Sequence, residues 1–248
     1  MNGRVVTGNE SACAVGDLKY IQHYREAGFT LLQGCFHAEE IASWRAECDR
    51  LVAELQKTDH PRVSGRKHLS LGAIMDRLDP VLDLSPIFSA LASDQRLTNP
   101  TEALIGGPVA LFKDKLIMKP PGTYGYDVHQ DYPYWELLGI PAEEMLSVWV
   151  AIDEANEKNG ALEIYPGMHQ SRIPGTPDAP MDTDPSLLEG FSPKRVDLMP
   201  GDVMFFHSLA PHRSAPNHSA QSRRCLLLTY VPQRFAHLYH EYYRKKLH

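Results

Sequence analysis

The sequence predicts a mainly β fold with flanking helices, in which one domain of 248 residues forms an antiparallel sandwich or barrel. Beyond residue 108 the chain contains short segments rich in branched and aromatic residues, separated by Gly, Pro, Asn and Asp. Such segments are typical of strands joined by turns. No amphipathic helix alternates with them, which disfavours a parallel sheet of βαβ units. Short strands with frequent turn signals indicate a sandwich or a barrel.

The N-terminal part is expected to be helical after a loose tail at residues 1–15. Asp17 is placed to cap a short helix that Gly28 ends, and residues 29–32 follow as a strand. A longer amphipathic helix is predicted from apolar residues at three- and four-residue steps. These residues are Ile41, Trp44, Cys48, Leu51 and Leu55. A helix of this kind covers a sheet or another helix.

The middle of the chain leads into the β-rich part. Residues 58–72 are polar and are expected to form a loop, and residues 82–97 one or two short helices broken at Pro86. The barrel core is predicted at residues 108–232. Its candidate strands are VALFKDKLIM, LSVWVAI, ALEIY, KRVDLM, DVMFF and RRCLLLTYV. Residues 171–193 carry five prolines and little periodicity, which predicts a lid loop over a site.

The overall composition excludes several classes of protein. The formal net charge is -6 and the pI is near 6.0, with no basic stripe of the kind that binds nucleic acid. No apolar run is long enough to span a membrane, and no cluster of Lys and Arg indicates a membrane surface. The four cysteines lie far apart without a C-x-x-C pair. We therefore expect a cytoplasmic protein with a small-molecule partner, and the sequence leaves its oligomeric state open.

The first chemical candidate is the tripeptide His129-Gln130-Asp131. On a strand, residues i and i+2 share a face, so an imidazole and a carboxylate can point to one metal ion. Two histidines and one carboxylate hold non-heme iron(II) and leave coordination positions open. The third ligand is sought in GDVMFFHSLAPHRSAPN, which contains His207 and His212. Residue types alone leave both histidines as candidates.

The second chemical candidate is Arg223, at the start of an apolar strand. A cation that enters a buried strand needs an anionic partner, because an unpaired buried charge is costly. A guanidinium binds a carboxylate through two parallel hydrogen bonds, so a dicarboxylate cosubstrate is one candidate partner. A salt bridge to an Asp or Glu on a neighbouring strand is the other. Arg224 alternates in facing and points the opposite way.

Six segments in this order resemble the phytanoyl-CoA dioxygenase family of Fe(II)/2-oxoglutarate oxygenases, over roughly residues 18–235. They are KPPG (119–122), HQDYPYW (129–135), WVAID (149–153), NGALEIYPGMH (159–169), GDVMFFH (201–207) and PHRSAPN with the following RR (211–224). The resemblance implies a double-stranded β-helix, a cupin-like jelly roll, with the N-terminal helices packed outside it. This agrees with the strand pattern.

The resemblance also implies roles for particular residues. His129, Asp131 and His212 correspond to the iron ligands, and Arg223 to the arginine that pairs with the distal carboxylate of 2-oxoglutarate. Further positions that match the cosubstrate pocket are Ser214, Lys115 and Trp149. Aromatic residues beside the presumed ligands are candidates for contact with substrate; these are Tyr126, Tyr132, Tyr134 and Trp135.

The implied activity is that of an oxidoreductase that uses Fe(II), 2-oxoglutarate and O2. Such a dioxygenase oxidises a C–H bond of a small-molecule metabolite, by hydroxylation or a related reaction in secondary metabolism, and releases succinate and CO2. The carboxylate of Asp131 disfavours halogenation, since halogenating relatives carry a small residue there. Hydroxylation, desaturation, epoxidation, cyclisation and demethylation all remain open. So does the identity of the substrate.

Two other functions compete with this interpretation. A cupin-like metal-dependent hydrolase or isomerase would use the same three ligands and would not need Arg223. A non-catalytic barrel that binds a small molecule would need neither the complete ligand set nor the arginine. The joint presence of both favours the oxygenase.

Overall fold

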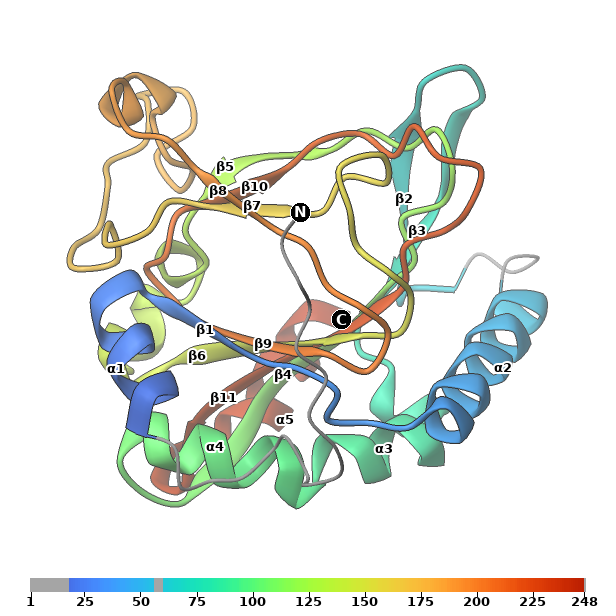
Figure 1. Cartoon of the computed structure of the whole chain (residues 1–248), viewed down its shortest axis with the longest axis horizontal. Coiled ribbons are helices and arrows are strands. Elements are labelled where there is room, and N and C mark those ends of the chain that lie inside the picture. Colours follow the sequence, from blue (N-terminus) through green and yellow to red (C-terminus); the bar gives the residue numbers. More distant parts are fainter. Residues whose placement is uncertain (1–17, 56–59, 248) are drawn as a thin grey trace, which may run out of the picture.

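A computed structural model describes residues 18–55 and 60–247 of the chain. Two antiparallel sheets face each other, and helices pack on the outer side of the larger sheet (Figure 1). The strand order is β1-β9-β6-β11-β4-β3-β2 in the larger sheet and β5-β10-β7-β8 in the smaller. This arrangement confirms the predicted jelly-roll fold, although the described strands form two sheets rather than one closed barrel.

The larger sheet contains β1 (Phe29–Leu32), β2 (Val63–His68), β3 (Gly72–Leu78), β4 (Val109–Ile117), β6 (Leu146–Ala151), β9 (Val203–His207) and β11 (Cys225–Pro232). The smaller sheet contains β5 (Tyr126–His129), β7 (Leu162–Ile164), β8 (Lys194–Val196) and β10 (His212–Ser214). The α-helices are α1 (Leu18–Ala27), α2 (Ala38–Leu55), α3 (Pro86–Ala92), α4 (Gln95–Ile105) and α5 (Leu238–Leu247). Short 3-10 helices include η1 (Leu82–Leu84), η2 (Tyr132–Tyr134), η3 (Glu136–Leu138), η4 (Ala142–Glu144), η5 (Pro185–Leu188) and η6 (Gln233–Phe235).

The central strands of the larger sheet are buried on both faces, which explains their continuous apolar sequence. On β6, Val148 and Val150 join the core under the helices, while Trp149 and Ala151 join a second core between the sheets. The strand β11 alternates in the same way. The outer face of the sheet therefore stabilises the fold, and the inner face is available to line a cavity.

The N-terminal elements follow the predicted pattern. Helix α1 ends directly before Gly28, whose φ of 82° lies in the left-handed region that favours glycine. Helix α2 buries Ile41, Trp44, Cys48 and Leu51, the predicted apolar face. Asp17 and the tail at residues 1–15 lie outside the described residues.

Of two expectations for the middle of the chain, the first was wrong and the second was confirmed. Residues 58–72, predicted as a loop, contain β2 and the start of the β2–β3 hairpin. The hairpin lies at the end of the larger sheet, where its strands are held by backbone hydrogen bonds. The sequence of β2 is polar, so it lacks the alternation of apolar and polar residues by which a strand is predicted. The expected break at Pro86 is present: η1 ends at Leu84 and Pro86 begins α3, with the Ser85 hydroxyl accepting from the Phe88 amide at 3.2 Å.

The segment 171–193 is packed against the smaller sheet. Its residues Ile173 and Leu188 contact Val128 and Tyr165 in one apolar cluster. Arg172 also forms an ion pair with Glu136 at 2.6 Å. The segment projects at the upper left of Figure 1, and its role as a lid stays a prediction.

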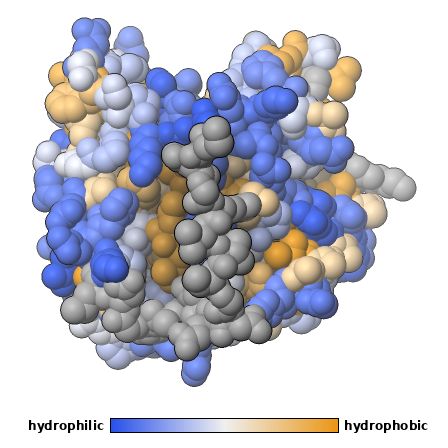
Figure 2. Space-filling view, in the orientation of Figure 1, coloured by the Kyte–Doolittle hydropathy of each residue, from blue (hydrophilic) through white to orange (hydrophobic). Residues whose placement is uncertain are grey.

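No disulfide joins two of the described residues, and Cys35, Cys48 and Cys225 are buried. Within 18–55 and 60–247, no helix combines the length and the apolar character needed to cross a membrane. Hydrophilic residues dominate the face seen in Figure 2, and apolar residues show in its middle and in smaller groups toward its edges.

One glycine tests the packing of the smaller sheet. A Cβ at Gly125 would lie 1.9 Å from the carbonyl oxygen of Ser214, so Gly125→Ala must push β5 away from β10. We expect the free energy of unfolding to fall by about 1–3 kcal/mol, as for other overpacked sites. Urea denaturation measures it. Gly107→Ala is the control, because a Cβ there meets nothing within 4 Å. Equal losses in both variants would contradict the proposed close contact.

Candidate active site

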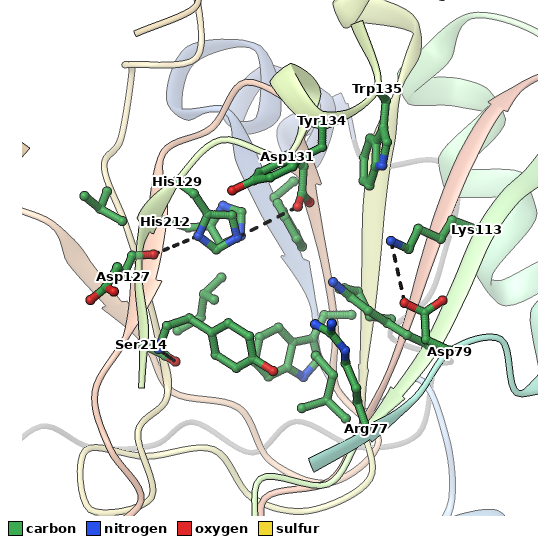
Figure 3. Close-up of a pocket in the computed structure, with 18 of the residues that line it drawn as sticks. Arg77, Asp79, Lys113, Asp127, His129, Asp131, Tyr134, Trp135, His212 and Ser214 are labelled. Atoms are coloured by element: carbon green, nitrogen blue, oxygen red, sulfur yellow. Dashed lines mark hydrogen bonds and ion pairs between the residues drawn. The ribbon is translucent and has the colours of Figure 1, made fainter. Parts of the chain in front are cut away.

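Two histidines meet across the β5–β10 pair. His129 ends β5 and lies directly opposite His212, the first residue of β10, in the antiparallel register. Their ring centroids are 4.3 Å apart. Figure 3 shows both imidazoles side by side at one wall of a cavity of about 580 Å³. Strand pairing thus brings together two residues that are 83 positions apart in the chain.

Asp131 completes a cluster of three potential ligands. One ligand atom from each of His129, Asp131 and His212 can be chosen so that all lie within 4.8 Å of one another. Asp131 does not lie on the strand, as the alternation argument assumed. It follows β5 in a helical turn, with φ -73° and ψ -37°, at the start of η2. The turn, rather than strand alternation, directs its carboxylate toward the histidines.

Backbone carbonyls fix the orientation of both imidazoles. Nδ1 of His129 lies 2.8 Å from the carbonyl oxygen of Asp127, and Nδ1 of His212 lies 2.9 Å from that of Ala210. A carbonyl only accepts, so each Nδ1 carries the proton and donates it. Each Nε2 is then left with a free lone pair, as a metal ligand requires.

The surroundings keep the cluster in its metal-binding protonation state. Burial lowers the pKa of His212 to about 4, and the neighbouring His129 adds to this effect, so His212 is neutral near pH 7. Burial by itself raises the pKa of Asp131, but His212 and Lys115 hold that pKa below its usual value. Ser147 Oγ also donates to Asp131 Oδ2 at 3.2 Å. The neutral imidazole of His212 and the ionised carboxylate of Asp131 are ligands suited to iron(II).

His207, the other candidate for the third ligand, lies elsewhere. It ends β9, and its ring packs against His169 at 5.2 Å and Tyr24 at 6.2 Å between centroids. Its Nδ1 accepts a hydrogen bond from the Leu209 amide at 3.0 Å. Burial lowers the pKa of His207 to about 4. This histidine belongs to the packing beneath the site rather than to the ligand cluster.

Arg223 is buried in the cavity wall without an acidic partner. Only 2% of the residue is exposed, and its guanidinium carbon lies 4.5 Å from the ring centroid of Trp149. One N–H donates to the Gly160 carbonyl at 2.9 Å, while Nε, shielded from solvent, has no hydrogen-bond partner. No carboxylate in the described part of the chain forms an ion pair with Arg223. Arg224, in contrast, faces outward and pairs with Asp153 and Asp49.

Ser214 and Trp149 line the same end of the cavity. The Ser214 hydroxyl oxygen accepts from Lys119 Nζ at 2.8 Å and from the Tyr126 amide at 3.3 Å. Its own proton is therefore free to be donated into the cavity. Trp149 Nε1 is another buried donor that lacks a partner in the described residues. Together with Arg223, these groups form an end of the cavity that is rich in donors.

The remaining predicted residues fall into two groups. Lys115, Tyr126, Tyr134 and Trp135 line the cavity. Tyr126 donates its hydroxyl to Asp76 at 2.6 Å, and Tyr134 bonds to Asp182 of the segment 171–193. Tyr132 is not among the lining residues, because its ring packs with Trp135 and Ile140 and its hydroxyl donates to the Ile140 carbonyl at 3.1 Å.

Several residues of the site were missed in the sequence. Gln130 is fully buried: its Nε2 donates to the carbonyls of Ser171 and Leu209, and its Oε1 accepts from the Ile173 amide at 2.7 Å. It ties the segment 171–193 to the turn before His212. Other cavity residues that sequence reasoning did not select are Arg77, Asp79, Lys113, Tyr242 and Lys246. The position of Gln130 between two candidate ligands was its only signal.

The comparisons with known proteins agree with this geometry. The family model described as phytanoyl-CoA dioxygenase matches residues 24–225, and the chain belongs to that family. It is an iron- and 2-oxoglutarate-dependent dioxygenase, an oxidoreductase that also uses O2. The hydrolase and non-catalytic alternatives are not favoured.

Among curated relatives, a methylphosphonate hydroxylase of Gimesia maris is 30% identical over 84% of this chain and 74% of its own length. An ectoine dioxygenase of Bordetella parapertussis is 28% identical over 85% of this chain and 73% of its own. A solved structure of EctD from S. alaskensis with 2-oxoglutarate and 5-hydroxyectoine superposes with a TM-score of 0.77, at 22% identity, covering 88% of this chain and 77% of that one. This likeness supports the fold.

The depressed pKa of His207 predicts a dependence of stability on pH. The imidazole titrates near 6.5 in the unfolded chain but near 4 in the folded protein. As pH falls below 6.5, His207 binds a proton in the unfolded state but not in the folded state. The free energy of unfolding therefore decreases progressively down to pH 4. The loss amounts to about 3 kcal/mol.

Urea denaturation at pH 7 and at pH 4 measures this loss. His207→Asn keeps an acceptor for the Leu209 amide and removes the titration. We expect the stability of this variant to fall less between the two pH values than that of the unchanged protein. Identical losses in the two proteins would show that His207 does not titrate as described.

Proposed function

We propose that His129, Asp131 and His212 hold the Fe(II) ion of this oxygenase, and that Arg223 anchors 2-oxoglutarate beside it. One observation carries the proposal: three potential ligands converge at one wall of a cavity whose other end holds a buried arginine without a counterion. A dicarboxylate with one end at the metal and the other at Arg223 would satisfy both.

The donor-rich end suits the distal carboxylate of the cosubstrate. Arg223 Nε and Trp149 Nε1 lack partners, and Ser214 has a proton to donate. A bound carboxylate would accept from these groups and offset the cost of burying the arginine. Trp149 also stacks on the guanidinium and limits its rotation. Lys115 extends from β4 near Asp131, where its ammonium would attract the carboxylate nearer the metal.

The protein contributes positioning and the exclusion of water. When bound, the iron supplies the O2 chemistry that couples decarboxylation of 2-oxoglutarate, to succinate and CO2, with oxidation of a substrate C–H bond. The carbonyls of Asp127 and Ala210 hold the imidazoles, and Ser147 holds the carboxylate. Gln130 keeps the segment 171–193 against the site, where that segment would serve as the lid.

We further propose that the substrate is a small metabolite that is hydroxylated. The similarity to a methylphosphonate hydroxylase and to an ectoine dioxygenase supports a small polar substrate. Tyr134 and Trp135 line the cavity and would contact it. The cytoplasm is the proposed compartment, in keeping with the buried thiols of Cys48 and Cys225, which form no disulfide among the described residues.

The assignment of the third ligand can be tested by spectroscopy. Without oxygen, the protein with Fe(II) and 2-oxoglutarate should show the weak visible charge-transfer band of the chelate, and His212→Ala should abolish it. Loss of a group that merely supports a ligand already costs about 10- to 100-fold in metal affinity, so loss of a ligand should cost more. His218→Ala, at an exposed position, is the control. A band that persists in His212→Ala but not in His207→Ala would reverse the assignment.

The arginine anchor can be tested with the same band. Arg223→Lys keeps the charge but loses the paired hydrogen bonds, so the dissociation constant for 2-oxoglutarate should rise by about 10-fold or more. Arg224→Lys is the matched control, because its side chain pairs with surface acids outside the cavity. A larger effect of the Arg224 substitution would move the anchor to the neighbouring position.

A further inference from the structure

The cavity carries an excess of positive charge on the wall that faces the two histidines. The cations are Arg77 of β3, Lys113 and Lys115 of β4, and Lys246 of α5. One carboxylate, that of Asp79, lies among them. Figure 3 shows Arg77, Lys113 and Asp79 across the cavity from His129 and His212. Four cations and one acid leave three positive charges unbalanced on this wall, which we call the cationic wall.

Asp79 carries one negative charge, so it can balance only one of the two lysines that it contacts. Its carboxylate lies 3.7 Å from Lys113 Nζ and pairs with Lys246. It also accepts a hydrogen bond from the Tyr243 hydroxyl at 3.1 Å. Only 3% of Asp79 is exposed, so its carboxylate interacts with these protein groups rather than with water. The three remaining positive charges of the wall must be balanced by other anions.

Arg77 has no such anion in the described part of the chain. No hydrogen bond or ion pair of its guanidinium occurs there, and Nε is shielded from solvent. Lys115 likewise has no ion pair among these residues. A cation held away from water without a partner destabilises a protein, and a bound anion removes that cost. The wall therefore has the composition of a binding site rather than of a structural ion-pair network.

The acids elsewhere in the cavity do not balance this wall. Asp131 belongs to the ligand cluster, and Asp182 is bonded to Tyr134. Asp127 is exposed and offers its backbone carbonyl to His129. The distal carboxylate of 2-oxoglutarate is already provided for by Arg223. An anion at the cationic wall would then be a second one, distinct from the carboxylate held at Arg223.

Aromatic residues surround the Lys113 ammonium of this wall. Lys113 Nζ lies 5.4 Å from the ring centroid of Trp135 and 5.0 Å from that of Tyr242, and it donates to the Tyr242 hydroxyl at 2.8 Å. Two aromatic rings thus fix the direction of the ammonium. A guanidinium and two oriented ammonium groups suit the several oxygens of an oxyanion.

We propose that Arg77, Lys113 and Lys246 bind an anionic group of the substrate, a phosphonate, a phosphate or a carboxylate, and hold the neighbouring C–H bonds toward the metal ligands. The inference rests on the proposed function, because it takes the opposite wall to be the iron site. It adds the substrate class: small organic oxyanions. Helix α5, at the far end of the chain, then takes part in specificity.

Calorimetric titration with inorganic phosphate tests the wall directly. The protein is first saturated with Fe(II) and 2-oxoglutarate without oxygen, so that the Arg223 end is filled. Phosphate should bind, and Arg77→Gln should weaken it at least about tenfold, the effect of losing one charged hydrogen-bonding partner. Lys246→Gln should also weaken it. Lys158→Gln, which removes an exposed lysine outside the cavity, should leave it unchanged.

Thermal unfolding of the same variants separates binding from structure. Arg77→Gln should match or exceed the unchanged protein in melting temperature, since it removes a cation without a partner. A fall in melting temperature with unchanged phosphate affinity would make Arg77 structural and overturn the proposal. Weak phosphate binding that is equal in all variants would indicate an adventitious ion only and would also overturn the proposal. The same holds if Arg77→Gln weakens the binding of 2-oxoglutarate instead of phosphate.

Succinate release then tests the substrate class. Small phosphonates and carboxylates should stimulate release, whereas their uncharged esters should not, and Arg77→Gln should remove most of this difference. Equal stimulation by esters and acids would refute the proposal. A missing charge-transfer band would count against the iron site alone. The cationic wall can still be tested by measuring phosphate binding to the metal-free protein.

Discussion

The pairing of β5 with β10 is the constraint on which the site depends. It sets His129 opposite His212, and the bare backbone of Gly125 permits the close approach of the two strands. The turn that follows β5 then brings Asp131 to the same point. Shifting either strand by one residue would turn its histidine to the other face. Backbone hydrogen bonding, rather than any contact between the ligands, therefore creates the cluster.

One face of the larger sheet packs against the helices, and the other face lines the space between the sheets. Alternate residues of β6 and β11 pack under the helices, and the intervening residues line the space between the sheets. The same alternation sends Arg223 inward to Trp149 and Arg224 outward to Asp153. Stability derived from the outer core permits the inner face to carry charged groups that do not stabilise the fold.

Several polar groups that line the cavity lack hydrogen-bond partners among the described residues. Arg223 Nε, Trp149 Nε1 and Arg77 Nε are all shielded from water without a hydrogen bond. Buried polar groups are ordinarily paired, so three such donors around one cavity indicate ligands rather than defects of packing. Two of them lie at the proposed cosubstrate end and the third at the cationic wall. A bound ligand would complete the interactions that these groups leave open.

Local patterns in the sequence were enough for the fold class, the apolar face of α2, and a candidate site around His129 and Asp131, because periodicity and short motifs are properties of neighbouring residues. Residue types could not choose between His207 and His212, and they hid the polar β2–β3 hairpin. Only the tertiary structure assembled the cationic wall, since Arg77, Lys113 and Lys246 come from three distant elements. Strand pairing and helix docking decide which distant side chains share a cavity, and these long-range contacts leave no periodic trace in the chain.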